Sequence, residues 1–191
     1  FTSSVLLRSN DIFMDVYDKP DKVHSFLHKI TVTAIKIALI GKELREDSEY
    51  KMEGVGFTDD FGGLLSPDMY REFSCRYMKM YADFFEADRR RLHSEILKPG
   101  HLKHFSYTGI TNFDGGTGSY LTYDDLRSEL DIPAEIQLKT TEDMFDETPE
   151  GVKKKFKQMV ENGAESVVVE LCRGVPGENV EAFVEIAREY E

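Results

Sequence analysis

Short apolar runs alternate with longer amphipathic segments along this chain. In the longer segments, apolar residues recur every three to four positions, which is the spacing of one helix face. An alternation of strand-like and helix-like segments is typical of βα units around a parallel sheet. The pattern predicts five strands, at Val55–Thr58, at Arg91–Leu92 running into His93, at Ile110–Phe113, at Ile136–Leu138 and at Val167–Leu171.

The starts of several helices are marked by capping sequences. Proline is favoured at the first helical position, and Ser, Thr or Asp at the positions just before it. We therefore expect helices to begin at Pro20, Pro67 and Pro149, the last of which should stop at Asn162-Gly163. A final helix should carry its apolar face on Val180, Phe183, Val184 and Ala187.

The predicted elements read as one continuous layer system. No repeat of fixed period, low-complexity segment or linker interrupts the sequence, so residues 1–191 are expected to form a single domain. The chain opens on Phe1 within what reads as mid-domain sequence, and we expect it to be the C-terminal part of a longer fold. An unpaired strand edge would then favour a homodimer.

Charge narrows the range of partners. Thirty-six acidic against twenty-four basic side chains give a net charge of −12, which disfavours nucleic acid or an anionic membrane as a partner.

Cysteine usage and hydropathy indicate the compartment. The chain has Cys75 and Cys172 but no CxxC pair and no signal-peptide pattern, so we expect a reducing, cytoplasmic location. The apolar stretch from Ile30 to Ile40 is interrupted by Thr31 and Lys36 and is predicted to be a buried helix face, not a membrane span.

Polar residues follow each predicted strand directly. In parallel α/β barrels the carboxyl ends of the strands meet at one rim, where active sites are built. The pattern favours a concave polar site, although strand-end Asp and Thr residues also cap turns and helices. The residues concerned are Asp59-Asp60, His93-Ser94-Glu95, Asp114, Lys139-Thr140 and Cys172-Arg173.

A metal site is one hypothesis for this rim. Positions i and i+2 of an extended segment point to one side, so His93 and Glu95 can face one ion, and the Cys172 thiolate can join them from another strand. These three ligands would carry a charge of −2, balance Zn²⁺ and leave one coordination position open. The alternative is that His93 is an ordinary structural histidine. Zinc deaminases also use His-x-Glu, but the Pro-Cys-x-x-Cys that they require is missing.

The other rim residues have candidate roles in catalysis and binding. Asp59 and Asp60 are candidates for a catalytic acid/base pair, with support of the substrate or capping of the next turn as alternatives. Asp114, Lys139 and Arg173 are candidates for substrate binding.

Two further features are assigned no role in the chemistry. Cys75 falls off the apolar stripe of its helix and is interpreted as a bystander. The basic run Arg89-Arg90-Arg91 is interpreted as a solvated loop leading into a strand.

Six motifs in order resemble the second half of the uroporphyrinogen decarboxylase superfamily. The likeness runs over nearly the whole chain and implies a (β/α)8 TIM barrel, of which about five βα units are present. The motifs are Phe1-Thr2-x-x-x-x-Leu7-Arg8, Met14-Asp15-x-Tyr17-Asp18-x-Pro20, Asp60-x-Gly62-Gly63-Leu64-x-Ser66-Pro67, Leu92-His93-Ser94, Thr148-Pro149-Glu150 and Gly174-x-Pro176-x-Glu178-Asn179-Val180.

The decarboxylase branch of the superfamily fits less well at its substrate-facing positions. By the resemblance, decarboxylases carry Tyr where this chain has Leu6, Ser where it has Asp60, and His where it has Arg173.

The corrinoid-dependent methyltransferase branch is more similar at the metal positions. It binds zinc through His-x-Cys and a second Cys just under eighty residues later, and Cys172 lies 79 residues after His93. Glu95 replaces the first Cys, which keeps the charge and makes the ion a harder Lewis acid. The resemblance implies zinc, a small-molecule methyl donor or acceptor, and a separate corrinoid protein as partner. A decarboxylase-like lyase and a catalytically silent barrel remain as alternatives.

Overall fold

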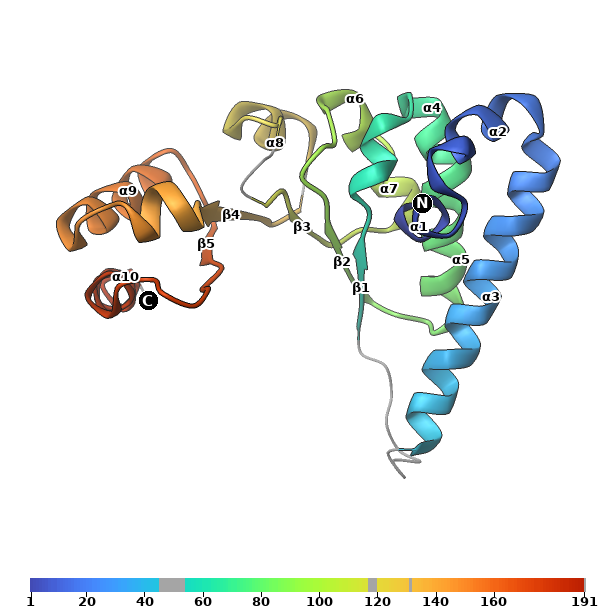
Figure 1. Ribbon diagram of the computed structural model, residues 1–191. Coiled ribbons are helices and arrows are strands. Elements are labelled where there is room, and N and C mark those ends of the chain that lie inside the picture. The colour runs from blue at the N-terminus through green and yellow to red at the C-terminus, as the bar shows by residue number, and fades with distance from the viewer. Residues whose placement is uncertain (45–53, 117–119, 131, 191) are drawn as a thin grey trace.

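A computed structural model of the protein describes residues 1–44, 54–116, 120–130 and 132–190. Its centre is a five-stranded sheet in the order β1-β2-β3-β4-β5, in which every neighbouring pair is parallel (Figure 1). The predicted α/β fold of consecutive parallel βα units is therefore confirmed. The strands are β1 (Gly54–Thr58), β2 (Arg89–His93), β3 (Asn112–Asp114), β4 (Ala134–Leu138) and β5 (Ser166–Val169).

The basic run before His93 is part of β2, so its interpretation as a solvated loop was wrong. Alternation along the strand turns Arg90 towards the helices, where its guanidinium donates hydrogen bonds to the carbonyls of Ala87 and Thr108 and to Asp83. Arg91 lies on the opposite face of the sheet. The hydrogen bonds of Arg90 explain why a charged residue is tolerated on the helix-facing side.

The helices begin where their capping residues predict. Ser66 Oγ accepts a hydrogen bond from the Met69 amide at 3.4 Å, and Thr148 Oγ1 accepts one from the Gly151 amide at 3.2 Å. Gly163, at φ 90°, follows the helix that ends at Glu161. The α-helices are α1 (Thr2–Arg8), α2 (Ile12–Asp18), α3 (Pro20–Leu44), α4 (Pro67–Tyr70), α5 (Arg76–Phe84), α6 (Pro99–Leu102), α7 (Phe105–Thr108), α8 (Tyr123–Glu129), α9 (Pro149–Glu161) and α10 (Gly177–Arg188).

Shorter helical turns connect these elements. They are the 3₁₀ turns η1 (Ser9–Asp11) and η2 (Asp60–Leu64) and the π-helical turns η3 (Arg71–Cys75) and η4 (Thr140–Phe145). The extra residue per turn in η3 shifts the face of the helix between α4 and α5. Cys75 is consequently fully buried, although the regular spacing of three to four residues placed it off the apolar stripe.

The two faces of the sheet differ in chemistry. On the helix side, Leu92, Phe113 and Leu138 are fully buried under helices. The strand pairings place His93 beside Asp114, and Asp114 beside Glu135, on the opposite face. Because residues alternate between faces, the apolar core and the polar rim come from the same short strands. At one end of the molecule, β5 packs with α9 and α10 around Leu138, away from α1 to α5 (Figure 1).

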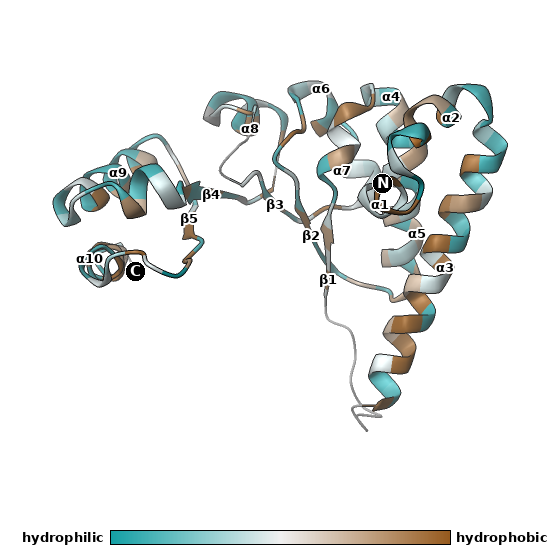
Figure 2. Cartoon of the chain, in the orientation of Figure 1, coloured by the Kyte–Doolittle hydropathy of each residue, from teal (hydrophilic) through white to brown (hydrophobic). Residues whose placement is uncertain are grey.

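The long helix α3 has a mixed surface. Thr31 and Ile35 are buried, whereas Ile37 and Ile40 are 64% and 53% exposed. The prediction of a buried face from Ile30 to Ile40 is thus correct for one side of the helix only, and Figure 2 shows the hydrophobic end. By length and composition alone α3 is apolar enough to cross a membrane, a test that the core helix of a soluble protein also passes.

We predict that Gly63→Ala destabilises the fold at the junction of β1 with β2. A Cβ at residue 63 would lie 2.3 Å from the carbonyl oxygen of Ile96, so the backbone must shift. The expected loss is about 1–3 kcal/mol, or roughly 2–4 °C in Tm for each kcal/mol, measured by thermal unfolding. Gly56→Ala is the control, because its Cβ would meet nothing within 4 Å. Equal effects of the two changes would contradict this packing.

Candidate functional site

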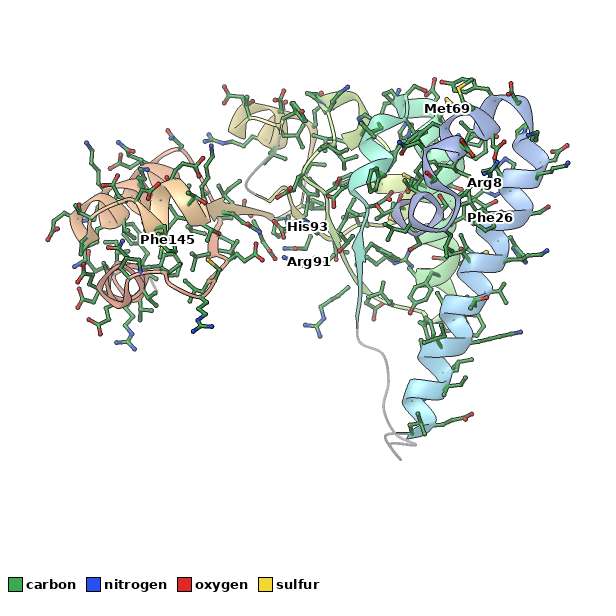
Figure 3. The ribbon with its side chains drawn as sticks, viewed as in Figure 1. Arg8, Phe26, Met69, Arg91, His93 and Phe145 are labelled. Atoms are coloured by element: carbon green, nitrogen blue, oxygen red, sulfur yellow. The ribbon has the colours of Figure 1, made fainter. Side chains whose placement is uncertain are left out.

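A cluster of polar side chains crosses three adjacent strands on the face of the sheet opposite the helix-covered core. Arg91 and His93 come from β2, Asp114 comes from β3, and Glu135 and Gln137 come from β4. The pairings His93↔Asp114 and Asp114↔Glu135 bring them together. Figure 3 shows Arg91 and His93 near the middle of the sheet. We call these five residues the strand cluster.

Asp114 is the centre of the strand cluster. Its side chain is only 3% exposed. Oδ2 contacts His93 Nδ1 at 2.8 Å and accepts a hydrogen bond from Arg91 Nη2 at 2.8 Å. Oδ1 accepts hydrogen bonds from the Gly116 amide at 2.9 Å and from Gln137 Nε2 at 3.0 Å. Four contacts match the acceptor capacity of one carboxylate, so the group is held in one orientation.

The surroundings of Asp114 favour its ionised form. Burial by itself raises the pKa of this carboxyl, but the hydrogen bonds from His93 and the Gly116 amide and the charges of His93 and Arg91 outweigh it. The net result is a pKa below the usual aspartate value. Arg91 is held in turn by Glu135, whose hydrogen bonds raise the pKa of the guanidinium.

The contact with Asp114 determines which nitrogen of His93 carries the proton in the neutral ring. An ionised carboxylate only accepts hydrogen bonds, so Nδ1 donates and Nε2 keeps its lone pair. Among the described residues, no hydrogen-bond partner is found for Nε2, and the His93 side chain is 25% exposed. Such a ring can accept a proton or ligate a metal through Nε2.

Asp60 and Glu95 connect the segments that follow β1 and β2. Asp60 Oδ1 accepts a hydrogen bond from the Glu95 amide at 3.0 Å, which fixes the loop after β2. The Glu95 side chain packs over Gly116, where an added Cβ would lie 2.6 Å from Glu95 Cγ. The carboxyl ends of β1, β2 and β3 are thereby tied together.

Asp59 has a different environment from Asp60. It is 1% exposed, and its Oδ1 accepts hydrogen bonds from Thr2 N at 2.7 Å and Thr2 Oγ1 at 3.1 Å. Its Oδ2 accepts the hydroxyl of Ser74. These contacts fasten α1 and η3 to the end of β1, which is a structural role for a residue that sequence placed among the catalytic candidates.

The remaining predicted site residues lie outside the strand cluster. Lys139, Cys172 and Arg173 are exposed at the ends of β4 and β5, and Cys172 is a free thiol. Within the described ranges, no group of three or more His, Cys, Asp or Glu side chains is arranged to hold a metal ion. As they lie, His93, Glu95 and Cys172 are therefore not assembled into the predicted three-ligand site, because Cys172 follows a strand three positions away across the sheet.

Sequence reasoning missed Arg91, Glu135 and Gln137. The i, i+2 spacing of Arg91 with His93, and of Glu135 with Gln137, indicates shared faces. The contact of Arg91 with Glu135 also requires the strand order and register, which are properties of the folded sheet.

The comparisons with known proteins point to one family. The model of the family described as uroporphyrinogen decarboxylase (URO-D) matches residues 3–190. Uroporphyrinogen decarboxylases from three strains of Coxiella burnetii (Dugway 5J108-111, RSA 331 and RSA 493) are 33% identical over 67 residues, which is 35% of this chain and 17% of each relative. The fold is similar to that of a methyltransferase from Methanosarcina mazei, with a TM-score of 0.71 at 18% identity, over 95% of this chain and 54% of that one.

We predict that Asp114→Asn lowers the free energy of unfolding by about 1–3 kcal/mol at neutral pH, since a buried charge-assisted network is lost. The pKa of Asp114 is lowered in the folded state, so its contribution is complete above the unfolded pKa of about 3.9 and is lost as the pH falls through the folded value. Denaturant unfolding at pH 7 and at about pH 3 measures the difference between the two proteins.

The control for this change is Asp18→Asn, because Asp18 is exposed at the end of α2. We expect only a small effect on the free energy of unfolding at pH 7 from a change at this exposed position. A difference between wild type and Asp114→Asn that stays constant on acidification would contradict the ionised network.

Proposed function

The chain belongs to the uroporphyrinogen decarboxylase family, and from this premise we propose that it is a zinc-dependent methyltransferase acting on a small molecule at the carboxyl ends of its strands. The single observation that carries the proposal is the His93–Asp114 contact at 2.8 Å. It leaves Nε2 as the basic nitrogen of a ring whose orientation is fixed, and metal-ligating histidines in proteins are held in this way by a carboxylate.

Two of the three proposed zinc ligands lie at the end of β2, whereas the third follows β5. His93 would bind through Nε2, and Glu95, whose amide is fixed by Asp60, would bind from the same end of β2. Cys172 would have to approach from the end of β5, because no group of three such side chains is arranged around an ion among the described residues. When bound, zinc would supply a Lewis acid that activates the methyl acceptor or the leaving group.

The protein residues would then have separate tasks. Asp114 orients His93, and Asp60 positions Glu95 through its amide. Lys139 and Arg173, exposed at neighbouring strand ends, would bind polar groups of the substrate. The methyl group would pass to or from a corrinoid carried by a separate protein, a partner inferred from the resemblance to the methyltransferase branch.

The alternative function is a decarboxylase-like lyase, which the identity to the Coxiella burnetii uroporphyrinogen decarboxylases favours. The charge of the strand cluster argues against a polyanionic porphyrinogen. Arg91 is bound by both Asp114 and Glu135, so one cation faces two carboxylates on that face of the sheet. Within the strand cluster, the one guanidinium is already paired with two carboxylates, which is unfavourable for binding an anionic substrate there.

We predict that the protein, purified without chelators, carries about one equivalent of zinc, and that His93→Ala and Cys172→Ser each reduce it below about a tenth. Elemental analysis measures the metal. Methyl transfer is measured by the change in absorbance when free cob(I)alamin becomes methylated. A panel of methylated thiols, amines and alcohols serves as methyl donors. Glu95→Cys should retain the metal and favour softer ions.

The control is Cys75→Ala. Burial raises the pKa of the Cys75 thiol to about 11, so it is not a thiolate ligand at neutral pH, and its loss should leave the zinc content unchanged. A wild-type protein without transition metal that cannot be reconstituted with zinc would overturn the proposal. Release of carbon dioxide from a porphyrinogen by that metal-free protein would establish the lyase instead.

A further inference from the structure

Arg91 of β2 contacts carboxylates on both of the other strands of the strand cluster. Its Nε and Nη2 donate to Glu135 Oε1 and Oε2 at 3.1 and 2.5 Å, a two-point contact from β2 to β4. The same Nη2 donates to Asp114 Oδ2 at 2.8 Å, on the strand between them. One guanidinium therefore joins two carboxylates from two strands while its own side chain is 47% exposed.

We propose that Arg91, held by Glu135, is a positioning residue that fixes the Asp114 carboxylate and, through it, the orientation of the His93 imidazole. This inference rests on the proposed function, in which His93 Nε2 is a ligand. Arg91 acts through Asp114. Glu135 keeps the guanidinium in place by a two-point contact, the geometry in which arginine and a carboxylate fit each other best.

The geometry of Asp114 Oδ2 supports this role. That oxygen receives Arg91 Nη2 and contacts His93 Nδ1, both at 2.8 Å, so the two groups share one acceptor. Rotation of the carboxylate towards either partner would strain the contact with the other. The arginine thus prevents the carboxylate from turning away from the imidazole.

Loss of the arginine would also change the balance of charge. Asp114 and Glu135 are register partners on adjacent strands, and Arg91 is the cation that contacts both. Without it, two carboxylates with 3% and 17% exposed side chains would face each other. Their repulsion would displace at least one of them, and His93 would lose a fixed partner for Nδ1.

Arg90 provides a matched control on the same strand. It points to the opposite face and donates hydrogen bonds to Ala87 O, Thr108 O and Asp83. Arg90→Met removes the same side chain and charge as Arg91→Met and should lower thermal stability. It should not affect His93, because Ala87, Thr108 and Asp83, which the Arg90 guanidinium contacts, all lie outside the strand cluster.

The test compares Arg91→Met with Arg90→Met in two measurements. The first is ¹⁵N NMR of the histidine rings in zinc-free protein near pH 8, with His93 assigned by His93→Ala. We expect one neutral tautomer with the proton on Nδ1 in wild type and in Arg90→Met, and a mixture in Arg91→Met. The second is zinc affinity by chelator competition, which we expect to fall about 10- to 100-fold for Arg91→Met alone.

The proposal would be overturned if Arg91→Met kept the wild-type tautomer and changed the zinc affinity by less than about threefold. Loss of a residue that supports a metal ligand typically lowers metal affinity by about 10- to 100-fold. Should this variant not fold, Arg91→Lys and Glu135→Gln carry the same comparison, with smaller changes in the same direction. A wild-type protein that binds no zinc would overturn the proposed function, and the NMR measurement would then decide the role of Arg91 by itself.

Discussion

The rest of the site depends on the buried carboxylate of Asp114. It accepts hydrogen bonds from its own loop at Gly116, from Arg91 on β2 and from Gln137 on β4, and it holds the imidazole of His93. A buried charge is stable only when its oxygens are satisfied, so the fold has to bring these donors to one place. The same requirement that stabilises the carboxylate therefore gives His93 one orientation.

Much of the fold could be predicted from the sequence because its signals are local. Apolar runs mark strands, and Ser66, Thr148 and Gly163 act within one helical turn, so the element types follow from short stretches. Arg90 shows the limit. A charged run reads as a loop, but the Arg90 side chain is accommodated on the helix-facing side of β2. It donates hydrogen bonds to Asp83 of α5, Thr108 of α7 and Ala87 between α5 and β2.

The location of the candidate site could be predicted from the sequence, but only some of its residues could. Strand-end residues such as His93 and Asp114 follow from the rule that parallel strands end at one rim. The roles of Arg91 and Glu135 depend on register across β2, β3 and β4, which no local pattern specifies. For Cys172, the spacing along the chain predicted a metal ligand next to His93. In the structure, Cys172 is exposed after β5 and is not grouped with His93 among the described residues.

X-ray absorption at the zinc edge of the purified protein tests the central claim most directly, because it reports the atoms around the ion without reference to the substrate. Our account predicts imidazole scattering and N/O neighbours at about 2.0–2.2 Å with one sulfur at about 2.3 Å. His93→Ala should remove the imidazole signal. A shell of oxygen neighbours alone, or an imidazole signal that survives His93→Ala, would contradict the assignment of His93 as the ligand that Asp114 holds in place.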